Sequence, residues 1–245
     1  MRVSRQGSLH VGTSGWNYKH WRGPFYPDDL SSKRWLEYYV DRFSSVEINN
    51  SFYNLPETKT LEAWNATTPK SFLFTAKVSR YLTHMKKLKD PAEPLRRFLD
   101  RMQALESKLG PILFQLPPRW KCNPDRLAGV LERLPSDRPA AFEFRDESWW
   151  CDAVYALLRQ HNAALCIFDL AGTTSPKEIT ADFTYLRLHG PGDKYQGQYG
   201  KRGLSGWAGA ISNWRTSGVD CYCYFDNDDS GYAAMDALAL QEMLT

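Results

Sequence analysis

Short β-rich runs alternate with amphipathic helical patterns along almost the whole chain, and this alternation restricts the fold more than any other feature. Helical patterns with apolar residues at 3.6-residue spacing separate most of the runs. The segment 172–178, before the seventh run, has instead a composition typical of a loop. The eight runs lie at 9–13, 45–49, 72–76, 112–116, 141–144, 165–168, 183–188 and 219–225.

This alternation predicts a parallel sheet, because strands that alternate with helices form βαβ units. Two folds satisfy it, a closed (β/α)8 barrel and an open doubly wound sheet. Units of about 30 residues match the usual barrel size of ~250 residues, and no G-x-G-x-x-G motif follows the first run. We therefore predict an α/β, TIM-like (β/α)8 barrel. It forms a single domain over 9–245, after a flexible N-terminal tail at 1–8, with a weak or missing helix between strands six and seven.

Charge and cysteine content exclude several classes of protein. The 31 basic and 28 acidic residues give a formal net charge of +3. This charge is too small to indicate binding to a polyanion or to an anionic membrane. The sequence contains neither a run of 18 apolar residues nor the apolar core of a secretory signal, so we expect a cytoplasmic protein with no membrane partner. The five cysteines form no C-x-x-C pair, and neither a disulfide framework nor a zinc ribbon is indicated.

Polar side chains occupy alternate positions in several of the runs, or end them. In Leu186-Arg187-Leu188-His189 the apolar residues should face the helices, so Arg187 and His189 should face the barrel interior. An interior with a purely structural role would be filled by Val, Ile and Leu instead. The set predicted for this polar layer comprises the carboxylates Glu47, Glu143, Asp169 and Asp226, the cations Lys77, Arg145 and Arg187, and Asn49, Gln115 and His189.

Two interpretations of this polar layer compete. Buried charges are costly unless they are paired, so the layer is either an ion-pair network that satisfies itself or a site that holds a ligand. A ligand site is favoured because the charges gather at the C-terminal ends of the strands, where barrel active sites lie.

The loops that follow the runs add aromatic residues and glycines to this picture. Trp16, Tyr53 and His84 lie in the first three of these loops, and aromatic rings beside cations suit stacking on a flat ring or a sugar. Gly190 and Gly192 follow the seventh run, where barrels commonly bind phosphate. The two glycines either let backbone amides approach an anion or only form turns.

The same residues carry a resemblance to a known family over residues 10 to 241. The motifs are Gly12-Thr-Ser-Gly-Trp16, Val46-Glu-Ile-Asn-Asn-Ser-Phe-Tyr53, Leu109-Gly-Pro-Ile-Leu-Phe-Gln-Leu-Pro-Pro118, Phe142-Glu-Phe-Arg145, Arg187-Leu-His-Gly190 and Tyr224-Phe-Asp-Asn-Asp228. With them the chain resembles the YecE-like family, domain of unknown function 72. The resemblance implies a (β/α)8 barrel and no established reaction. Many relatives carry Arg-His where this chain has Arg145-Asp146.

Three classes of function remain open. The first is a hydrolase or lyase that acts on a small phosphorylated or carboxylated substrate. In this enzyme Lys77, Arg145 and Arg187 hold the anion, Glu47 or Glu143 is the general base, and His189 is the acid or proton shuttle. The second is a non-catalytic module that binds a small ligand or a protein, and the third is a barrel that binds or processes nucleic acid. The predicted catalytic set is Glu47, Glu143, His189 and Asp226. The predicted substrate-binding set is Trp16, Asn49, Tyr53, Lys77, His84, Gln115, Arg145, Asp169, Arg187 and Asn227.

We expect neither a metal nor another cofactor. The chain lacks an H-E-x-x-H motif, and the three cations of the polar layer compete for its carboxylates and repel a dication. The expected partner is therefore a small anionic ligand. The sequence does not indicate an oligomeric state.

Overall fold

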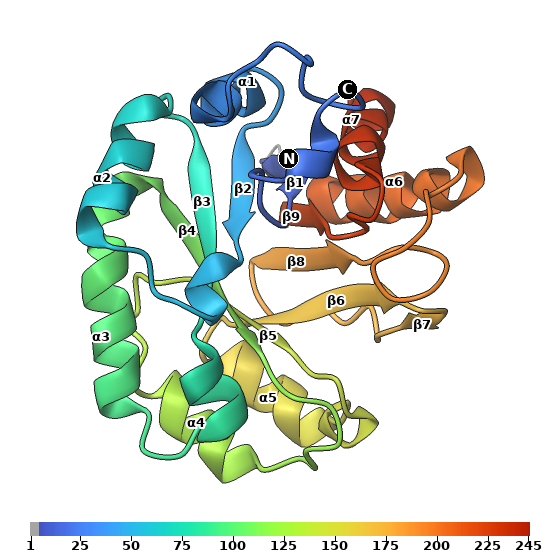
Figure 1. The fold of residues 1–245 in the computed structure, drawn as a ribbon. Helices are drawn as coiled ribbons and strands as arrows, with labels where there is room; N and C mark the ends of the chain where they lie inside the picture. Colours follow the sequence, from blue (N-terminus) through green and yellow to red (C-terminus); the bar gives the residue numbers. More distant parts are fainter. Residues whose placement is uncertain (1–4) are drawn as a thin grey trace. The chain divides into compact units, whose positions relative to one another are not determined.

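The computed structural model describes residues 5–245, in which parallel strands alternate with helices (Figure 1). The strands are β1 (Leu9–Thr13), β2 (Ser45–Ile48), β3 (Leu73–Lys77), β4 (Leu109–Gln115), β5 (Ala140–Glu143), β6 (Ala164–Leu170), β7 (Thr173–Thr174), β8 (Phe183–Leu188) and β9 (Asp220–Phe225). The helices are α1 (Trp35–Val40), α2 (Thr58–Thr67), α3 (Ala92–Met102), α4 (Pro124–Leu131), α5 (Asp152–Gln160), α6 (Lys201–Thr216) and α7 (Tyr232–Leu244). Short helical turns are η1 (Lys19–Trp21), η2 (Ser32–Arg34), η3 (Asn50–Phe52), η4 (Tyr81–Met85), η5 (Gln103–Lys108) and η6 (Glu147–Trp149).

The strands follow one another in the order β1-β9-β8-β6-β5-β4-β3-β2, and β7 pairs only with β6. A parallel bridge between Ser14 and Glu47 links the end of β1 to β2. This order and the alternation with helices confirm the predicted TIM-like (β/α)8 fold. No helix lies between β6 and β8. Ala171 and Gly172 turn the chain there with positive φ values of 50° and 78°, so that β7 folds back on β6 as an antiparallel pair.

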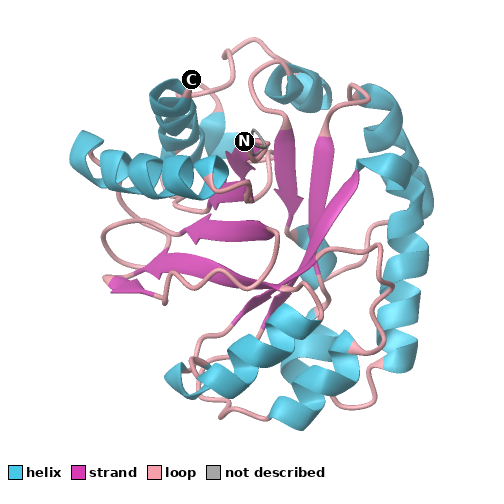
Figure 2. Ribbon diagram, turned by 180° about the vertical axis from the view of Figure 1, so that it is seen from behind, coloured by secondary structure: helices cyan, strands magenta, loops and turns pink. Residues whose placement is uncertain are grey.

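The described residues group into two compact units, one of which draws on both ends of the chain. Unit 1 comprises residues 5–47, 167–177 and 182–245, and unit 2 comprises 48–166 and 178–181. Within unit 1, α6 and α7 pack on β9, and α7 also packs on β1. Within unit 2, α2 and α3 lie alongside β3 and β4, as the view coloured by secondary structure also shows (Figure 2).

A glycine permits the close approach of β1 and β2 in unit 1. A Cβ atom at Gly12 would lie only 2.1 Å from the carbonyl oxygen of Ser45, so a larger residue would force the two strands apart. Tyr39 of α1 fixes the same region, because its hydroxyl accepts a hydrogen bond from Thr13 N at 2.9 Å and donates one to Ser45 O at 3.2 Å. The chain therefore brings the ends of β1 and β2 together at the positions that carry Ser14 and Glu47.

The N-terminal segment predicted to be flexible lies partly outside the described residues, because the structure describes none of residues 1–4. Gly7 N donates to Arg215 O at 2.8 Å, and Ser8 N donates to Asp220 Oδ1 at 2.6 Å. Arg5 forms an ion pair with the same aspartate at 2.9 Å. The predicted boundary between a tail and a domain at residue 9 stays a prediction.

Candidate functional site

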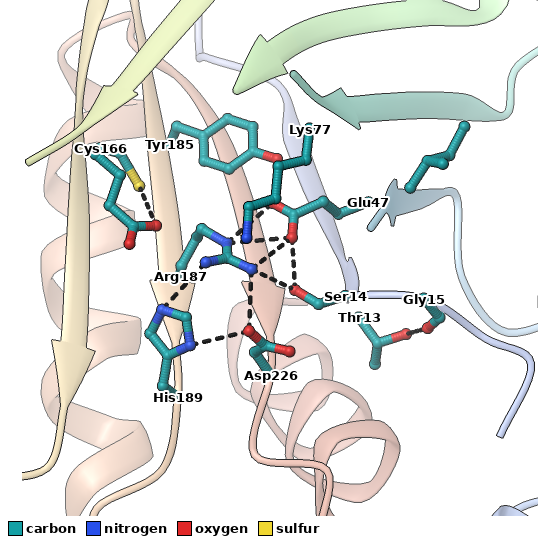
Figure 3. A network of polar contacts seen from close by, with 12 residues as sticks. Thr13, Ser14, Gly15, Glu47, Lys77, Cys166, Tyr185, Arg187, His189 and Asp226 are labelled. Carbon is teal, nitrogen blue, oxygen red and sulfur yellow. Dashed lines mark hydrogen bonds and ion pairs between the residues drawn. The ribbon is translucent and has the colours of Figure 1, made fainter. Parts of the chain in front are cut away.

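A buried ion pair between Glu47 of β2 and Arg187 of β8 lies at the centre of unit 1 (Figure 3). Both side chains are buried, with exposed fractions of 0% and 1%. Arg187 Nε lies 3.1 and 3.0 Å from the two oxygens of Glu47, and Nη2 donates to Oε1 at 2.8 Å. The two-pronged contact suits the planar guanidinium and offsets the cost of removing both charges from water.

Ser14 and Tyr185 complete the surroundings of the Glu47 carboxylate. The Ser14 hydroxyl donates to Oε1 at 2.7 Å, and the Tyr185 hydroxyl donates to Oε2 at 2.6 Å. Each oxygen of Glu47 therefore accepts hydrogen bonds from two different side chains, one of them Arg187. In this arrangement the carboxylate holds Arg187 in place and has little remaining capacity to accept a proton from a substrate.

Asp226 and His189 extend the network beyond Arg187 at the ends of β9 and β8 (Figure 3). Arg187 Nη2 donates to Asp226 Oδ2 at 3.0 Å, and His189 Nδ1 lies 3.0 Å from the same oxygen. His189 Nε2 lies 3.3 Å from Arg187 Nη1. Because a guanidinium only donates hydrogen bonds, Nε2 accepts, and the imidazole proton is on Nδ1, facing Asp226.

A second carboxyl group, Asp228, follows Asp226 in the loop after β9. Trp21 Nε1 donates to Asp228 Oδ1, and His20 Nε2 lies 3.3 Å from Oδ2. Burial is the main cause that raises the pKa of Asp228 to about 6; the negative charge of Asp226 acts in the same direction, whereas Trp21 and His20 oppose it. The side chains of Asp226 and Asp228 keep exposed fractions of 15% and 19%, so two carboxyl groups in contrasting surroundings both reach solvent.

Ser14, Tyr185 and Asp228 were not among the residues predicted for the site. Ser14 and Asp228 lie in loops, where strand parity says nothing about direction. For Asp228 the signal was present in the motif Tyr224-Phe-Asp-Asn-Asp228, in which two carboxylates alternate around one amide. Tyr185 lies two residues before Arg187 on β8, so the parity that selected Arg187 applies to it as well.

Two residues predicted to bind substrate, Asn227 and Asp169, belong to a hydrogen-bond network that fixes loops in unit 1. Asn227 Nδ2 donates to Asp236 Oδ2 of α7 at 2.7 Å and to Gly197 O at 2.9 Å. Asp236 Oδ2 also accepts from Tyr199 N at 2.9 Å, and the Tyr199 hydroxyl donates to Asp169 Oδ2 at 3.0 Å. Burial raises the pKa of Asp169. These contacts tie the loop after β8 to α7 and to the loop after β9.

Two aromatic residues of unit 1 lie around the same network. Trp16 is largely buried, and its carbonyl accepts a hydrogen bond from the Tyr26 hydroxyl at 2.6 Å. The ring of Tyr195, from the loop after β8, meets the ring of His189 edge-on with centroids 5.4 Å apart. Tyr195 therefore covers the imidazole in this structure.

The other predicted charges lie in unit 2. Glu143 ends β5 and forms an ion pair with Arg145, and both side chains are buried. Cys166 Sγ lies 3.9 Å from Glu143 Oε2. Lys77 ends β3, and its ammonium lies 4.3 Å from the centre of the Phe52 ring.

His84, from the turn η4, has a pKa that is lowered by burial and by neighbouring positive charges. Its Nδ1 lies 3.0 Å from the Thr83 hydroxyl, and its ring meets the edge of Phe52 at 5.0 Å. Burial is the main cause that lowers the pKa of His84 to about 4; the charges of Lys77, Arg80 and Arg145 act in the same direction, and that of Glu143 opposes them. An added anion near His84 would offset these cations.

Three predicted residues of unit 2 remain. Asn49 follows β2, and its Oδ1 atom is buried with no hydrogen-bond partner among residues 5–245. Gln115 ends β4 and is half-buried. Tyr53 is 75% exposed. Of these, Asn49 offers an acceptor that a bound ligand with an N–H or O–H group would satisfy.

Neither a metal site nor a membrane span emerges from residues 5–245. No group of three or more His, Cys, Asp or Glu side chains is arranged to hold a metal ion in this part of the chain. None of its helices combines the length and the apolar character needed to cross a bilayer.

Comparison with models of known protein families identifies the family of this chain. A family model described as "Protein of unknown function DUF72" matches residues 10–245. The chain belongs to the DUF72 family. This confirms the resemblance to domain of unknown function 72 that the sequence motifs indicated.

Relatives match the DUF72 chain over nearly its full length. A DUF72 family protein from Thermotoga maritima MSB8 is 29% identical, covers 97% of this chain and 99% of its own, and has a TM-score of 0.87. A DUF72 family structure from Enterococcus faecalis V583 is 20% identical, with coverages of 97% and 98% and a TM-score of 0.78; at this identity it supports the fold alone. The UPF0759 protein YunF of Bacillus subtilis (strain 168) is 24% identical over 269 residues, with coverages of 96% and 94%.

The conformation of the loop after β8 predicts that any residue larger than glycine at position 190, next to His189, destabilises the folded protein. Gly190 has a φ of +104°, and a Cβ atom there would lie 2.2 Å from Gln196 O. We expect Gly190→Ala to lower the free energy of unfolding in urea by about 2 kcal/mol or more, because the backbone must shift. Gly192→Ala is the matched control, since its Cβ would lie 3.5 Å from the same oxygen. Equal stability of the two variants would contradict this account.

The raised pKa of Asp228 predicts how stability depends on pH. The folded protein holds the Asp228 proton up to about pH 6, whereas an ordinary aspartate releases it near 3.8. The stability from this proton is therefore fully present below ~pH 4 and lost as the pH rises through 6. We expect Asp228→Asn to remove about 2 kcal/mol of the difference in unfolding free energy between about pH 4 and 7.

Urea unfolding curves at several pH values across that window measure the effect. The exposed neighbour Asp229 provides the control, because Asp229→Asn should keep the pH dependence of the parent protein. An unchanged pH dependence in Asp228→Asn would show that the carboxyl group ionises as it does in the unfolded chain.

Proposed function

We propose that this DUF72 protein is a hydrolase or lyase that transfers protons to and from a small phosphorylated or carboxylated substrate. The observation that carries the proposal is the pair of carboxyl groups after β9, Asp226 and Asp228. They are two residues apart, both reach solvent, and their surroundings favour different protonation states. Carboxyl groups held in opposite states are the usual means by which one site supplies both an acid and a base.

Each residue of the network has a role in this proposal. The positive charge of Arg187 stabilises the charged carboxylate of Asp226, which acts as the base. Asp228, with its pKa raised by burial to about 6, keeps a proton at mildly acidic pH and acts as the acid. His189 lies beside Asp226, with its Nδ1 atom 3.0 Å from Oδ2. Glu47, although predicted as a base, acts as a positioning residue because its oxygens already hold Arg187, Ser14 and Tyr185.

An activity screen with matched variants tests the proposal. The substrates are phosphate monoesters, with release of inorganic phosphate as the readout, and hydroxy acids, with the absorbance of an unsaturated product as the readout. We expect Asp226→Asn to lower kcat by about 100-fold or more. Asp228 should act only while it is protonated, so the rate should fall as the pH rises above about 6, and Asp228→Asn should flatten that profile at a lower rate.

The control is again Asp229→Asn, which should keep the rate and the pH profile of the parent protein. The proposal is wrong if neither substrate class is turned over, or if the Asp226 and Asp228 variants match the parent.

A second candidate function, binding of a small anion without turnover, is supported by the charges of unit 2. Beyond the effect of burial, the charges of Lys77, Arg80 and Arg145 all lower the pKa of His84, whereas that of Glu143, which is paired with Arg145, raises it. An anion bound near His84 would offset the three cations. Arg80 is exposed and offers a guanidinium that can bind a phosphate group through two N–H donors.

His84 itself provides the measurement for this second candidate. NMR titration of its ring should show the pKa rising from about 4 when inorganic phosphate is added, because the anion offsets the neighbouring cations. Arg80→Ala should weaken phosphate binding by about tenfold. Lys89→Ala, an exposed lysine in the following turn, should leave it unchanged. A His84 titration that phosphate does not move would refute anion binding in this region.

A further inference from the structure

A groove of about 850 Å³ lies on the surface of unit 2. Its walls come from the segment after η3, the turn η4, the first two turns of α3 and the residues after α4. Apolar side chains such as Leu55, Pro94 and Phe98 contribute to the lining, together with charged and aromatic groups. The volume lies within the range of sites that bind small molecules, about 300–1,000 Å³.

Two tyrosine rings are presented on the lining of this groove. Tyr53 is 75% exposed and Tyr81 is 51% exposed, and both line the groove. The Tyr53 ring packs against the ring of Phe52 in an edge-to-face contact, with centroids 5.0 Å apart. Exposed, supported rings of this kind are suited to stacking on a flat aromatic ligand.

Three cations line the same groove, namely Lys86, Arg97 and Arg133. The acidic residues of α3 do not offset them fully, because Glu93 and Asp100 each lie 2.8 Å from Arg96, on the same helix. Neither Arg97 nor Arg133 forms an ion pair among residues 5–245. Arg133 Nη1 donates to Gly129 O at 2.7 Å, which leaves the other N–H groups of Arg133 and the guanidinium of Arg97 for an anionic group in the groove.

The backbone beside the groove is held in an uncommon conformation. Lys87, Leu88 and Asp90 all have positive φ values, of 47°, 61° and 44°, which cost energy in residues other than glycine. This turn places Lys86 3.5 Å from Asp90 and 5.9 Å from the centre of the Tyr81 ring. Arg126 of α4 braces it by donating to Lys87 O at 3.1 Å. A strained turn that presents a cation beside an exposed ring is typical of a binding site.

We propose that this groove binds a nucleoside phosphate, with the base stacked on Tyr53 or Tyr81 and the phosphate held by Arg97 and Arg133. The exposed tyrosine rings suit a flat aromatic group, and the guanidinium groups suit an anion. A nucleoside phosphate contains both an aromatic base and an anionic phosphate. The volume suits a single nucleotide. A nucleic acid fits less well, because a formal net charge of +3 provides little attraction for an extended phosphate backbone.

Isothermal titration calorimetry with adenosine 5′-monophosphate tests the proposal. Arg97→Ala combined with Arg133→Ala should weaken binding by about tenfold or more, and Tyr53→Ala combined with Tyr81→Ala by about tenfold. The two Tyr→Phe changes keep the rings and should alter the dissociation constant by less than about twofold. Arg96→Ala is the control on α3, because that side chain is already paired with Glu93 and Asp100. All these side chains are exposed, so melting curves should confirm that the variants remain folded.

Three further ligands separate the proposed site from its alternatives. Ribose 5-phosphate and inorganic phosphate should bind at least about tenfold more weakly than the nucleotide, since neither can stack. Equal affinity would refute recognition of the base. A single-stranded oligonucleotide that binds much more tightly than the nucleotide, with a steep dependence on salt, would identify a nucleic-acid surface instead. Absence of nucleotide binding, or binding that the paired variants leave unchanged, would also overturn the proposal.

Discussion

The buried pair of Glu47 and Arg187 organises unit 1. Two charges removed from water destabilise a protein unless their hydrogen-bonding groups find partners, and here Ser14 and Tyr185 bind the carboxylate while Asp226 and His189 lie against the guanidinium. Four segments of the chain, the ends of β1, β2, β8 and β9, must therefore take up defined positions together. The same pair also holds Asp226, whose side chain is 15% exposed, at the end of β9.

The two units differ in the balance of charge around their polar groups. In unit 1 the guanidinium of Arg187 lies against the carboxylates of Glu47 and Asp226, and burial together with the charge of Asp226 raises the pKa of Asp228. In unit 2 burial and the charges of Lys77, Arg80 and Arg145 all lower the pKa of His84. The groove lined by Tyr53 and Tyr81 adds exposed aromatic surface to unit 2.

The fold and the centre of the network could be predicted from sequence because both depend on periodic patterns. Alternation along β8 identified Arg187 and His189, and the loop composition at 172–178 anticipated the missing helix. Helix α2 was not predicted, since Leu61 is the only residue in it that is fully buried and its apolar pattern is correspondingly weak. Asn227 and Asp169 were predicted to bind substrate, which stays a prediction; the structure shows them hydrogen-bonded to groups on α7 and in the loop after β8. No local pattern could reveal this, because these partners are distant in the sequence or lie in a loop without periodicity.

Unit 1 is built from segments at both ends of the chain, so it cannot fold until both ends have been synthesised. The bond between Glu47 and Arg187 joins residues 140 positions apart, and closing a loop of that length carries a large entropic cost before any contact offsets it. Residues 48–166 of unit 2 form a nearly continuous segment, so they can begin to fold during translation, whereas β1 must wait for β9 to leave the ribosome. Assembly of the network around Arg187 is thus a late event in folding, and the exposed early strand β1 depends on prompt completion of synthesis.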